Sequence, residues 1–204
     1  MKMNKFAAEV HQNAVEHGWW DEERSFGEII ALCHSELSEA LEEYRAKRPM
    51  VYFVVEMDDG KGGTYLAIRE DIISEEDFAG EKPEGIAVEL ADCIIRILDW
   101  YGKEGLDTDA LLLEAGIITM CDLPTPVYGS FGDFIALLHN LLSMAYACWC
   151  NASGISASAL RLAKCIREIM AWAKENGVDM EMVLDIKNEY NKGRPYRHLS
   201  LIHI

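Results

Sequence analysis

The chain repeats part of its own sequence, and this internal repeat limits its fold more than any other feature. Residues 25–40, SFGEIIALCHSELSEA, match residues 130–145, SFGDFIALLHNLLSMA, at ten of sixteen positions. Residues 89–107 match residues 161–179 at eight of nineteen positions, in the same order. A chain with such a repeat is expected to build the same structural unit twice. The offset between the matching blocks falls from 105 to 72, so the second copy lacks 33 residues.

Apolar residues recur at helical spacing through most of both copies, which predicts an all-α fold. Ser25 is a suitable N-cap residue, with Glu28 three positions later to complete a capping box. Cys33, Cys93 and Cys165 lie within apolar helical patterns and are expected to fill the core. The predicted helices of the first copy cover residues 3–17, 25–47, 84–103 and 107–118.

One segment of the first copy departs from the helical pattern. Near residues 50–70 the chain reads VYFVVEMDDGKGGTYLAIRE, with two β-rich runs around a glycine-rich turn. This pattern predicts a small β-hairpin. An insertion over about residues 48–82 accounts for the length that the second copy lacks, and KPEG at 82–85 is expected to return the chain to helix.

The repeat divides the chain into a first unit at 1–118 and a second unit at 130–198. Residues 119–129, TMCDLPTPVYG, contain two prolines and are expected to link the units. Residues 199–204 are a candidate non-native tail, because HLSLIHI resembles the translated read-through of a sequencing adaptor.

The composition predicts a cytoplasmic globular protein and disfavours two kinds of partner. The chain has no uninterrupted apolar run of about 18 residues, so we expect no membrane span. Charges interrupt the N-terminal segment, unlike a signal peptide, and six cysteines without zinc-site or CxxC spacing indicate reduced thiols. A net charge of −16 disfavours binding to nucleic acids and anionic membranes. A phosphorylated substrate remains compatible if a metal ion lies between the like charges.

Two pairs of acids in the first copy have the spacing of one helical turn. Glu36 and Glu39 form an ExxE motif, and Glu89 and Asp92 form an ExxD motif. Residues three apart share a helix face, so each pair presents two carboxylates in one direction. The second copy has lost all four acids, and the corresponding residues are Leu141, Met144, Arg161 and Lys164.

The replacement of Glu36 and Glu39 by apolar residues suggests that these positions face the interior. Inward carboxylates repel one another unless a cation binds them, and oxygen ligands favour Mg²⁺, with Mn²⁺ as a substitute. A solvated helix face is the alternative, and it is preferred for Glu42 and Glu43. A di-iron site is disfavoured because it needs Glu-x-x-His pairs, whereas His34 precedes Glu36 by two.

The C-terminal segment is basic in an otherwise acidic chain. Residues 187–198 read KNEYNKGRPYRH. The first copy has Ala115, Thr119 and Asp122 where the second has Lys187, Asn191 and Arg194. We therefore expect one complete site, with metal ligands from the first copy and phosphate-binding cations from the second. An ordinary soluble C-terminus is the alternative.

The combined motifs resemble the MazG-like nucleotide pyrophosphohydrolases of phages and bacteria. The resemblance rests on GWWD, HSELSEALEEYR, KPEGIAVELADCIIRILDWYG and the tail YNKGRPYRH. It implies four-helix-bundle repeats fused in tandem, and a homo-oligomer, such as a dimer, or an intramolecular pseudo-dimer. It also implies Mg²⁺-dependent hydrolysis of a nucleoside triphosphate to the monophosphate and pyrophosphate, a nucleotide-pool housecleaning activity. A catalytically inactive helical module that binds nucleotides or a partner protein is the alternative function.

The resemblance also implies a role for each matching residue. The metal ligands would be Glu36, Glu39, Glu89 and Asp92. Separately from the resemblance, we select Glu39 as the group that accepts the proton of the attacking water. A histidine on the first helix and a tryptophan nine residues later contact the base in pyrimidine-selective relatives, a spacing that His11 and Trp20 reproduce. The implied phosphate-binding residues are Lys187, Tyr190, Asn191, Arg194 and Arg197.

Overall fold

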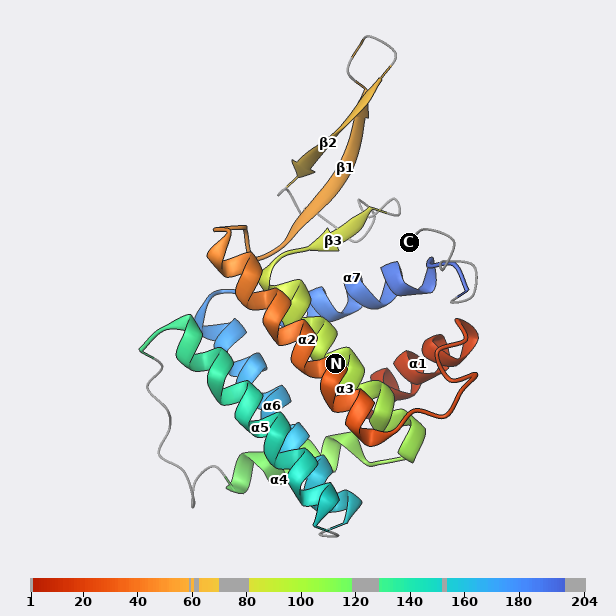
Figure 1. Cartoon of the computed structure of the whole chain (residues 1–204), viewed down its shortest axis with the longest axis vertical. Helices are drawn as coiled ribbons and strands as arrows, with labels where there is room; N and C mark the ends of the chain where they lie inside the picture. The colour runs from red at the N-terminus through yellow and green to blue at the C-terminus, as the bar shows by residue number, and fades with distance from the viewer. Residues whose placement is uncertain are drawn as a thin grey trace.

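The computed structural model describes residues 2–58, 60, 63–69, 81–118, 129–151 and 154–196. Over these ranges the chain is mostly helical, as the sequence pattern predicts, with one small antiparallel sheet (Figure 1). In the first half the helices are α1 (Met3–Glu16), α2 (Phe26–Arg45), α3 (Ile86–Glu104) and α4 (Thr108–Ile118). In the second half they are α5 (Phe131–Cys150), α6 (Ile155–Glu175) and α7 (Met180–Lys192). The strands are β1 (Tyr52–Asp58), β2 (Thr64–Arg69) and β3 (Lys82–Glu84).

The predicted capping box is present at the start of α2. The Ser25 hydroxyl accepts a hydrogen bond from the Glu28 amide at 3.2 Å, and the Glu28 carboxylate accepts one from the Ser25 amide at 2.9 Å. Ser130 caps α5 in the same way by accepting from the Asp133 amide at 3.1 Å. Such caps satisfy amides that a helix leaves unpaired at its first turn, so they define where both helices begin.

The sheet has the strand order β2-β1-β3, so β1 lies in the middle. The β1–β2 hairpin confirms the sequence prediction and projects beyond the helices in Figure 1. KPEG returns the chain to helix at α3, as expected, and its first three residues also form β3, which pairs with β1 at Tyr52↔Glu84 and which the sequence pattern did not predict. An edge strand tolerates Pro83, which cannot donate to a neighbour. Gly85 then starts α3 with φ +119, where a Cβ would meet the Met50 carbonyl oxygen at 2.7 Å.

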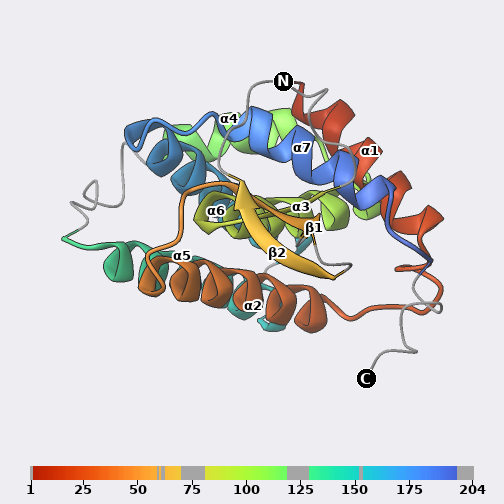
Figure 2. The same ribbon diagram turned by 90° about the horizontal axis from the view of Figure 1, so that it is seen from above.

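The helices of the two halves pack against each other rather than forming separate cores. Helix α3 lies between α2 on one side and α1 and α7 on the other (Figure 2). Helix α6 contacts α5 and α4, and α2 of the first half contacts α5 of the second half. One hydrophobic cluster therefore contains side chains from both halves, including the fully buried Leu37, Ile94, Leu138 and Ile166.

Two other sequence expectations concern this core. Cys33, Cys93 and Cys165 are free thiols and fully buried, as the apolar pattern predicts. In the described ranges, α5 is the one helix long and apolar enough to cross a membrane, by length and composition alone. Core helices of soluble proteins also meet that criterion, and the apolar face of α5 packs here on α2 and α6.

Candidate active site

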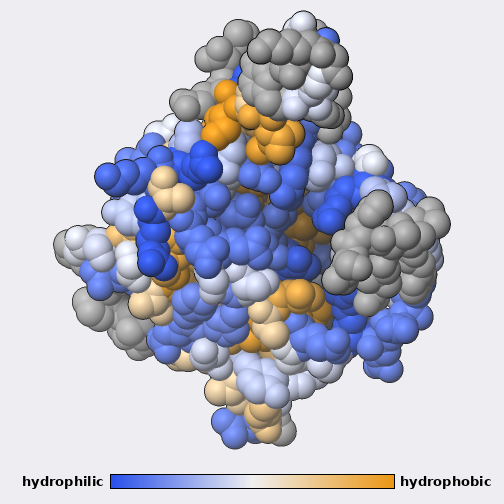
Figure 3. Space-filling view, turned by 45° about the horizontal axis from the view of Figure 1, so that its top comes forward, coloured by the Kyte–Doolittle hydropathy of each residue, from blue (hydrophilic) through white to orange (hydrophobic). Residues whose placement is uncertain are grey.

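A cleft of about 290 Å³ lies between α1, α2, α3 and α7 and is also lined by β3 and the loop before α2. Its acids come from α2 and α3, and its cations come from α7 and the residues just after it, from β3, from α3 and from the loop before α2. Figure 3, in which the top of the molecule in Figure 1 is turned toward the viewer, shows a largely hydrophilic surface. The cleft therefore combines negative and positive side chains from segments far apart in the sequence.

Three of the four predicted metal ligands meet in this cleft. Glu36 of α2 and Glu89 and Asp92 of α3 each place a carboxylate oxygen within 4.8 Å of the others. Oxygens bound to one Mg²⁺ lie at most about 4.2 Å apart, twice the metal–oxygen distance, so small side-chain rotations would fit the ion. An all-carboxylate set also suits the hard cations Mg²⁺ and Mn²⁺.

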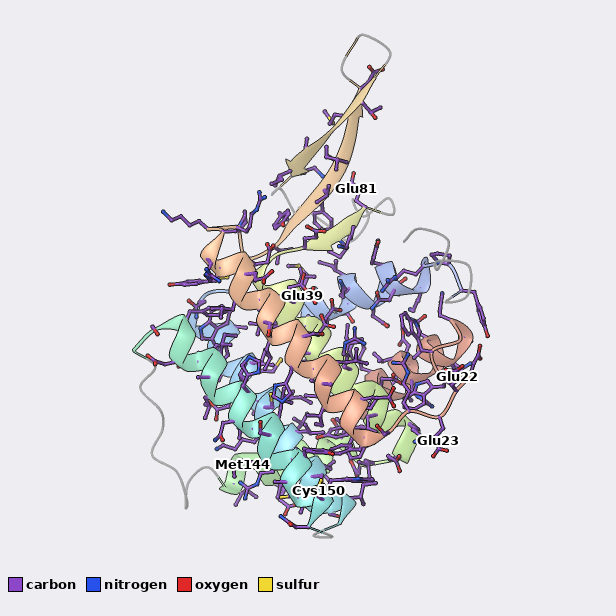
Figure 4. All side chains as sticks on the ribbon, viewed as in Figure 1. Glu22, Glu23, Glu39, Glu81, Met144 and Cys150 are labelled. Carbon is purple, nitrogen blue, oxygen red and sulfur yellow. The ribbon has the colours of Figure 1, made fainter. Side chains whose placement is uncertain are left out.

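Glu39, the fourth predicted ligand, lies apart from these three acids. It lines the same cleft one helical turn beyond Glu36, but its side chain is exposed (Figure 4). Glu36 by contrast is only 5% exposed. Glu36 is therefore buried, as expected for an ExxE position that faces the interior, whereas Glu39 lines the cleft with an exposed side chain.

Two of the acids already have cationic partners. The Arg96 guanidinium lies 2.5 Å from a Glu36 oxygen, and the Lys187 ammonium lies 2.7 Å from an Asp92 oxygen. Within the described part of the chain, Glu89 has no ion-pair partner. The cluster is therefore only partly neutralised by the protein itself.

The surroundings of the acids oppose their ionisation. Burial raises the pKa of Glu89 to about 8, and the charge of Asp92 adds to this effect while Lys187 opposes it. Burial also raises the pKa of Glu36, against the opposing effect of Arg96. Both shifts mean that the carboxylates are held where negative charge is unfavourable, a cost that a bound divalent cation would offset.

Helix α7 brings the predicted phosphate-binding residues to the other side of the cleft. Lys187, Tyr190 and Asn191 lie on α7, Arg194 lies two residues beyond its end, and all four line the cleft. Lys187 is 6% exposed, so its charge is largely removed from water and is compensated by the facing carboxylate of Asp92. Arg197, also predicted, lies outside the described residues.

His11 and Trp20, predicted to contact a base, are directed elsewhere. Both donate to the partly buried carboxylate of Asp99, His11 through Nδ1 at 2.8 Å and Trp20 through Nε1 at 2.9 Å. Neither ring is among the described residues that line the cleft, whereas Asp99 is. The neighbouring Trp19 lines the cleft instead, with the guanidinium groups of Arg24 and Arg194 5.2 and 5.9 Å from its ring centre.

Sequence reasoning missed a row of amides along one wall of the cleft. Asn188 of α7 donates to Glu9, and Asn13 of α1 donates to Asn188, each at 3.3 Å. Asn13 is 8% exposed, and its Oδ1 has no hydrogen-bond partner in the described part of the chain. The sequence did contain a signal for Asn13, because this polar residue follows Phe6 and Val10 at helical spacing and so lies on the apolar face of the helix.

Comparisons of the chain with protein-family models, curated proteins and solved structures found no match. The class of protein must therefore be inferred from the sequence motifs and from the chemistry of this cleft. That chemistry comprises a carboxylate cluster suited to a divalent cation and, facing it, basic and amide side chains suited to phosphate groups.

Proposed function

We propose that the chain is a Mg²⁺-dependent nucleoside triphosphate pyrophosphohydrolase of the MazG-like type. The observation that carries this proposal is the approach of Lys187 to Asp92, 2.7 Å apart between α7 and α3. It joins the predicted phosphate-binding segment to the predicted metal ligands in one cleft. A triphosphate that carries a divalent cation is the class of ligand that needs metal-binding carboxylates and phosphate-binding cations next to each other.

In the proposed reaction, water attacks the α-phosphorus and the α–β anhydride bond breaks, with the bridging oxygen leaving on pyrophosphate. Mg²⁺ held by Glu36, Glu89 and Asp92 would supply charge neutralisation and a more acidic water. Glu39, at the exposed rim, accepts the proton of that water. Lys187 and Arg194 bind the phosphates and stabilise the charge of the departing pyrophosphate, and Asn191 orients the polyphosphate.

We also propose that the two repeats are four-helix-bundle units paired as an intramolecular pseudo-dimer. Reciprocal aromatic contacts support this arrangement. Phe26 stacks on Trp149 with ring centres 4.6 Å apart, and Phe131 stacks on Tyr44 at the same distance. Phe26 corresponds to Phe131 in the repeat, and Tyr44 corresponds to Trp149. In an interface with two-fold symmetry each contact occurs twice, with the two equivalent residues exchanged between the halves.

The histidines that correspond in the repeat add a contact on the inferred axis. His34 and His139 place their Nδ1 atoms 2.7 Å apart, with ring planes inclined by only 13°. A residue that meets its own counterpart lies on or near a two-fold axis. This pairing favours the intramolecular pseudo-dimer over a dimer of two chains as the means of completing the site.

The last helix of each half also crosses to the opposite half. Helix α7 packs on α3, and its counterpart α4 packs on α6. In the second half, Lys164 and Glu168 stand where the first half has Asp92 and Arg96, and they lie 3.7 Å apart. The reversed charges leave no carboxylate cluster at those positions, which supports one working site per chain.

The proposal is tested by incubating the chain with each of the eight common NTPs and dNTPs and Mg²⁺. We expect release of pyrophosphate and the monophosphate from at least one of them, and none without a divalent cation. Release of inorganic phosphate alone would indicate cleavage at a different anhydride bond. No release from any nucleotide would contradict the proposed activity.

The competing function is a module that binds nucleotides without hydrolysing them. The neutralisation of Asp92 by Lys187 and of Glu36 by Arg96 favours it, because both acids are paired without a metal. Under this alternative, nucleotides would bind equally well with and without Mg²⁺, and no pyrophosphate would appear in the same assay.

A further inference from the structure

Tyr196, just beyond the end of α7, docks on the loop between α1 and α2. Its hydroxyl donates a hydrogen bond to a carboxylate oxygen of Asp21 at 2.6 Å. Its ring lies directly over Gly18, where a Cβ atom would come within 2.5 Å of the ring carbon Cζ. The contact therefore combines a charge-assisted hydrogen bond with close packing of the ring on the backbone.

Gly18 is needed at this contact for two separate reasons. Its φ of +76 lies in the left-handed region, which residues with a Cβ rarely adopt. Any side chain there would also occupy the space that the Tyr196 ring fills. The backbone that ends α1 is thus shaped to receive this ring.

The docked ring lies close to residues that line the cleft. Trp19 directly follows Gly18, and Arg194 precedes Tyr196 by two residues. The Arg194 guanidinium lies 5.9 Å from the Trp19 ring centre, a cation–π contact between the two segments that Tyr196 joins. Pro195, between Arg194 and Tyr196, has a fixed φ and restricts the backbone of Arg194 before it. Fixing Tyr196 therefore restricts where Arg194 can lie.

We propose that Tyr196 is a positioning residue, a latch that holds Arg194 and Trp19 at the mouth of the cleft over a bound polyphosphate. When Tyr196 is docked on Gly18 and Asp21, it keeps Arg194 in place. Release of Tyr196 opens the cleft for exchange of ligands. The inference rests on the proposed function in one respect, the assignment of Arg194 to the phosphate groups.

The latch itself is tested on the ligand-free full chain by hydrogen exchange of residues 17–24. Tyr196→Phe removes the hydroxyl, and Gly18→Ala removes the space for the ring. Both variants should exchange faster than the wild type over this segment. Gly177→Ala is the matched control, because Gly177 has a similar φ of +72 but nothing within 4 Å of an added Cβ. Unchanged exchange in both test variants would overturn the latch.

The positioning role is tested with inorganic tripolyphosphate and Mg²⁺, which needs no choice of base. Loss of the hydroxyl should weaken binding by about three- to tenfold, the net effect of one typical hydrogen bond at an exposed position. In turnover, KM should rise by the same factor and kcat should change little. Asp21→Asn, which keeps an acceptor oxygen, should retain most of the affinity.

The two tests separate a failure of the latch from a failure of the proposed function. Faster exchange in Tyr196→Phe with unchanged tripolyphosphate affinity would overturn the positioning role. If the wild type neither binds tripolyphosphate nor hydrolyses nucleotides, the proposed function and the phosphate role of Arg194 both fail. The exchange experiment would then still decide whether Tyr196 fastens the tail to the loop.

Discussion

The ammonium nitrogen of Lys187 lies 2.7 Å from a carboxylate oxygen of Asp92, and this pair joins the two halves of the chain at the centre of the cleft. The side chains are 7% and 16% exposed, so solvent and salt screen their attraction only weakly. Because a divalent cation at the carboxylate cluster would also bind Asp92, Lys187 and the metal would compete for this carboxylate until a phosphate group engaged the lysine.

The first prediction concerns this competition. Lys187→Met should raise the affinity for Mg²⁺ alone by roughly tenfold or more, because it removes a positive charge that opposes the ion at close range. The same change should weaken the binding of tripolyphosphate and abolish turnover. Isothermal titration with each ligand separately measures both effects. Lys192→Met is the control, since Lys192 pairs with Glu9 and Glu189 rather than with the carboxylate cluster. Equal Mg²⁺ affinity in Lys187→Met and the wild type would contradict the competition.

The second prediction separates metal binding from stability. Glu89→Gln and Asp92→Asn should each reduce pyrophosphate release by on the order of 100-fold or more through loss of a metal ligand. Their metal-free stabilities should differ. Asp92→Asn leaves the buried Lys187 unpaired and should cost about 1–3 kcal/mol. Glu89→Gln removes no ion pair, and it removes a carboxyl group whose ionisation is less favourable in the folded than in the unfolded chain, so it should raise the stability to denaturant at pH 7.

Glu42→Gln provides the control for that comparison, because Glu42 is exposed on the same helix as Glu36 and lies outside the cleft. It should retain full activity and full stability. Turnover that survived in either Glu89→Gln or Asp92→Asn would show that the cluster is not the metal site.

The third prediction concerns the pH dependence caused by Glu89. Its pKa in the folded chain is about 8, above its ordinary value of 4.5, so the folded state binds more protons than the unfolded state between these values. The stability of the metal-free protein should therefore decrease as pH rises from about 4.5 through about 8. Mg²⁺ affinity should increase over the upper part of that range. Urea unfolding in EDTA at several pH values measures the first effect, and Glu89→Gln should remove its contribution to the slope.

The fourth prediction concerns His34 and His139 and has the opposite sign. Burial lowers the pKa of both rings below their ordinary value of 6.5, and the charge of His139 lowers that of His34 further. Their contribution to stability should be complete above pH 6.5 and should be lost as pH falls through the lowered values. Unfolding of the metal-free Glu89→Gln variant isolates this effect. Adding His34→Gln should flatten the acid side of its curve, and an unchanged curve would count against the pair.

Part of the fold and of the site could be predicted from local patterns. The capping box at Ser25 and Glu28, the hairpin after α2, and the shared face of Glu89 and Asp92 all depend on residues within a few positions of each other. The pairing of β3 with β1 could not be predicted in this way. The two strands are separated by a long stretch of chain, and its length does not determine which of their residues pair. The tether of Trp20 to Asp99, which leaves Trp19 at the cleft, depends on the path of a loop around α3.

The sequence by itself predicted helices in both matching halves of the chain, and it placed the four carboxylates in the first half and the basic segment in the second. It did so because helical period, caps and charges are local properties that two copies in one chain make comparable. Only the tertiary structure decided that α7 crosses to α3, that Lys187 neutralises Asp92, and that Glu39 stays at the rim while Glu36 is buried. The physical reason is that two similar copies offer similar apolar faces. Which apolar face each helix covers depends on burying all the apolar faces at the same time, so no single segment of the sequence encodes it.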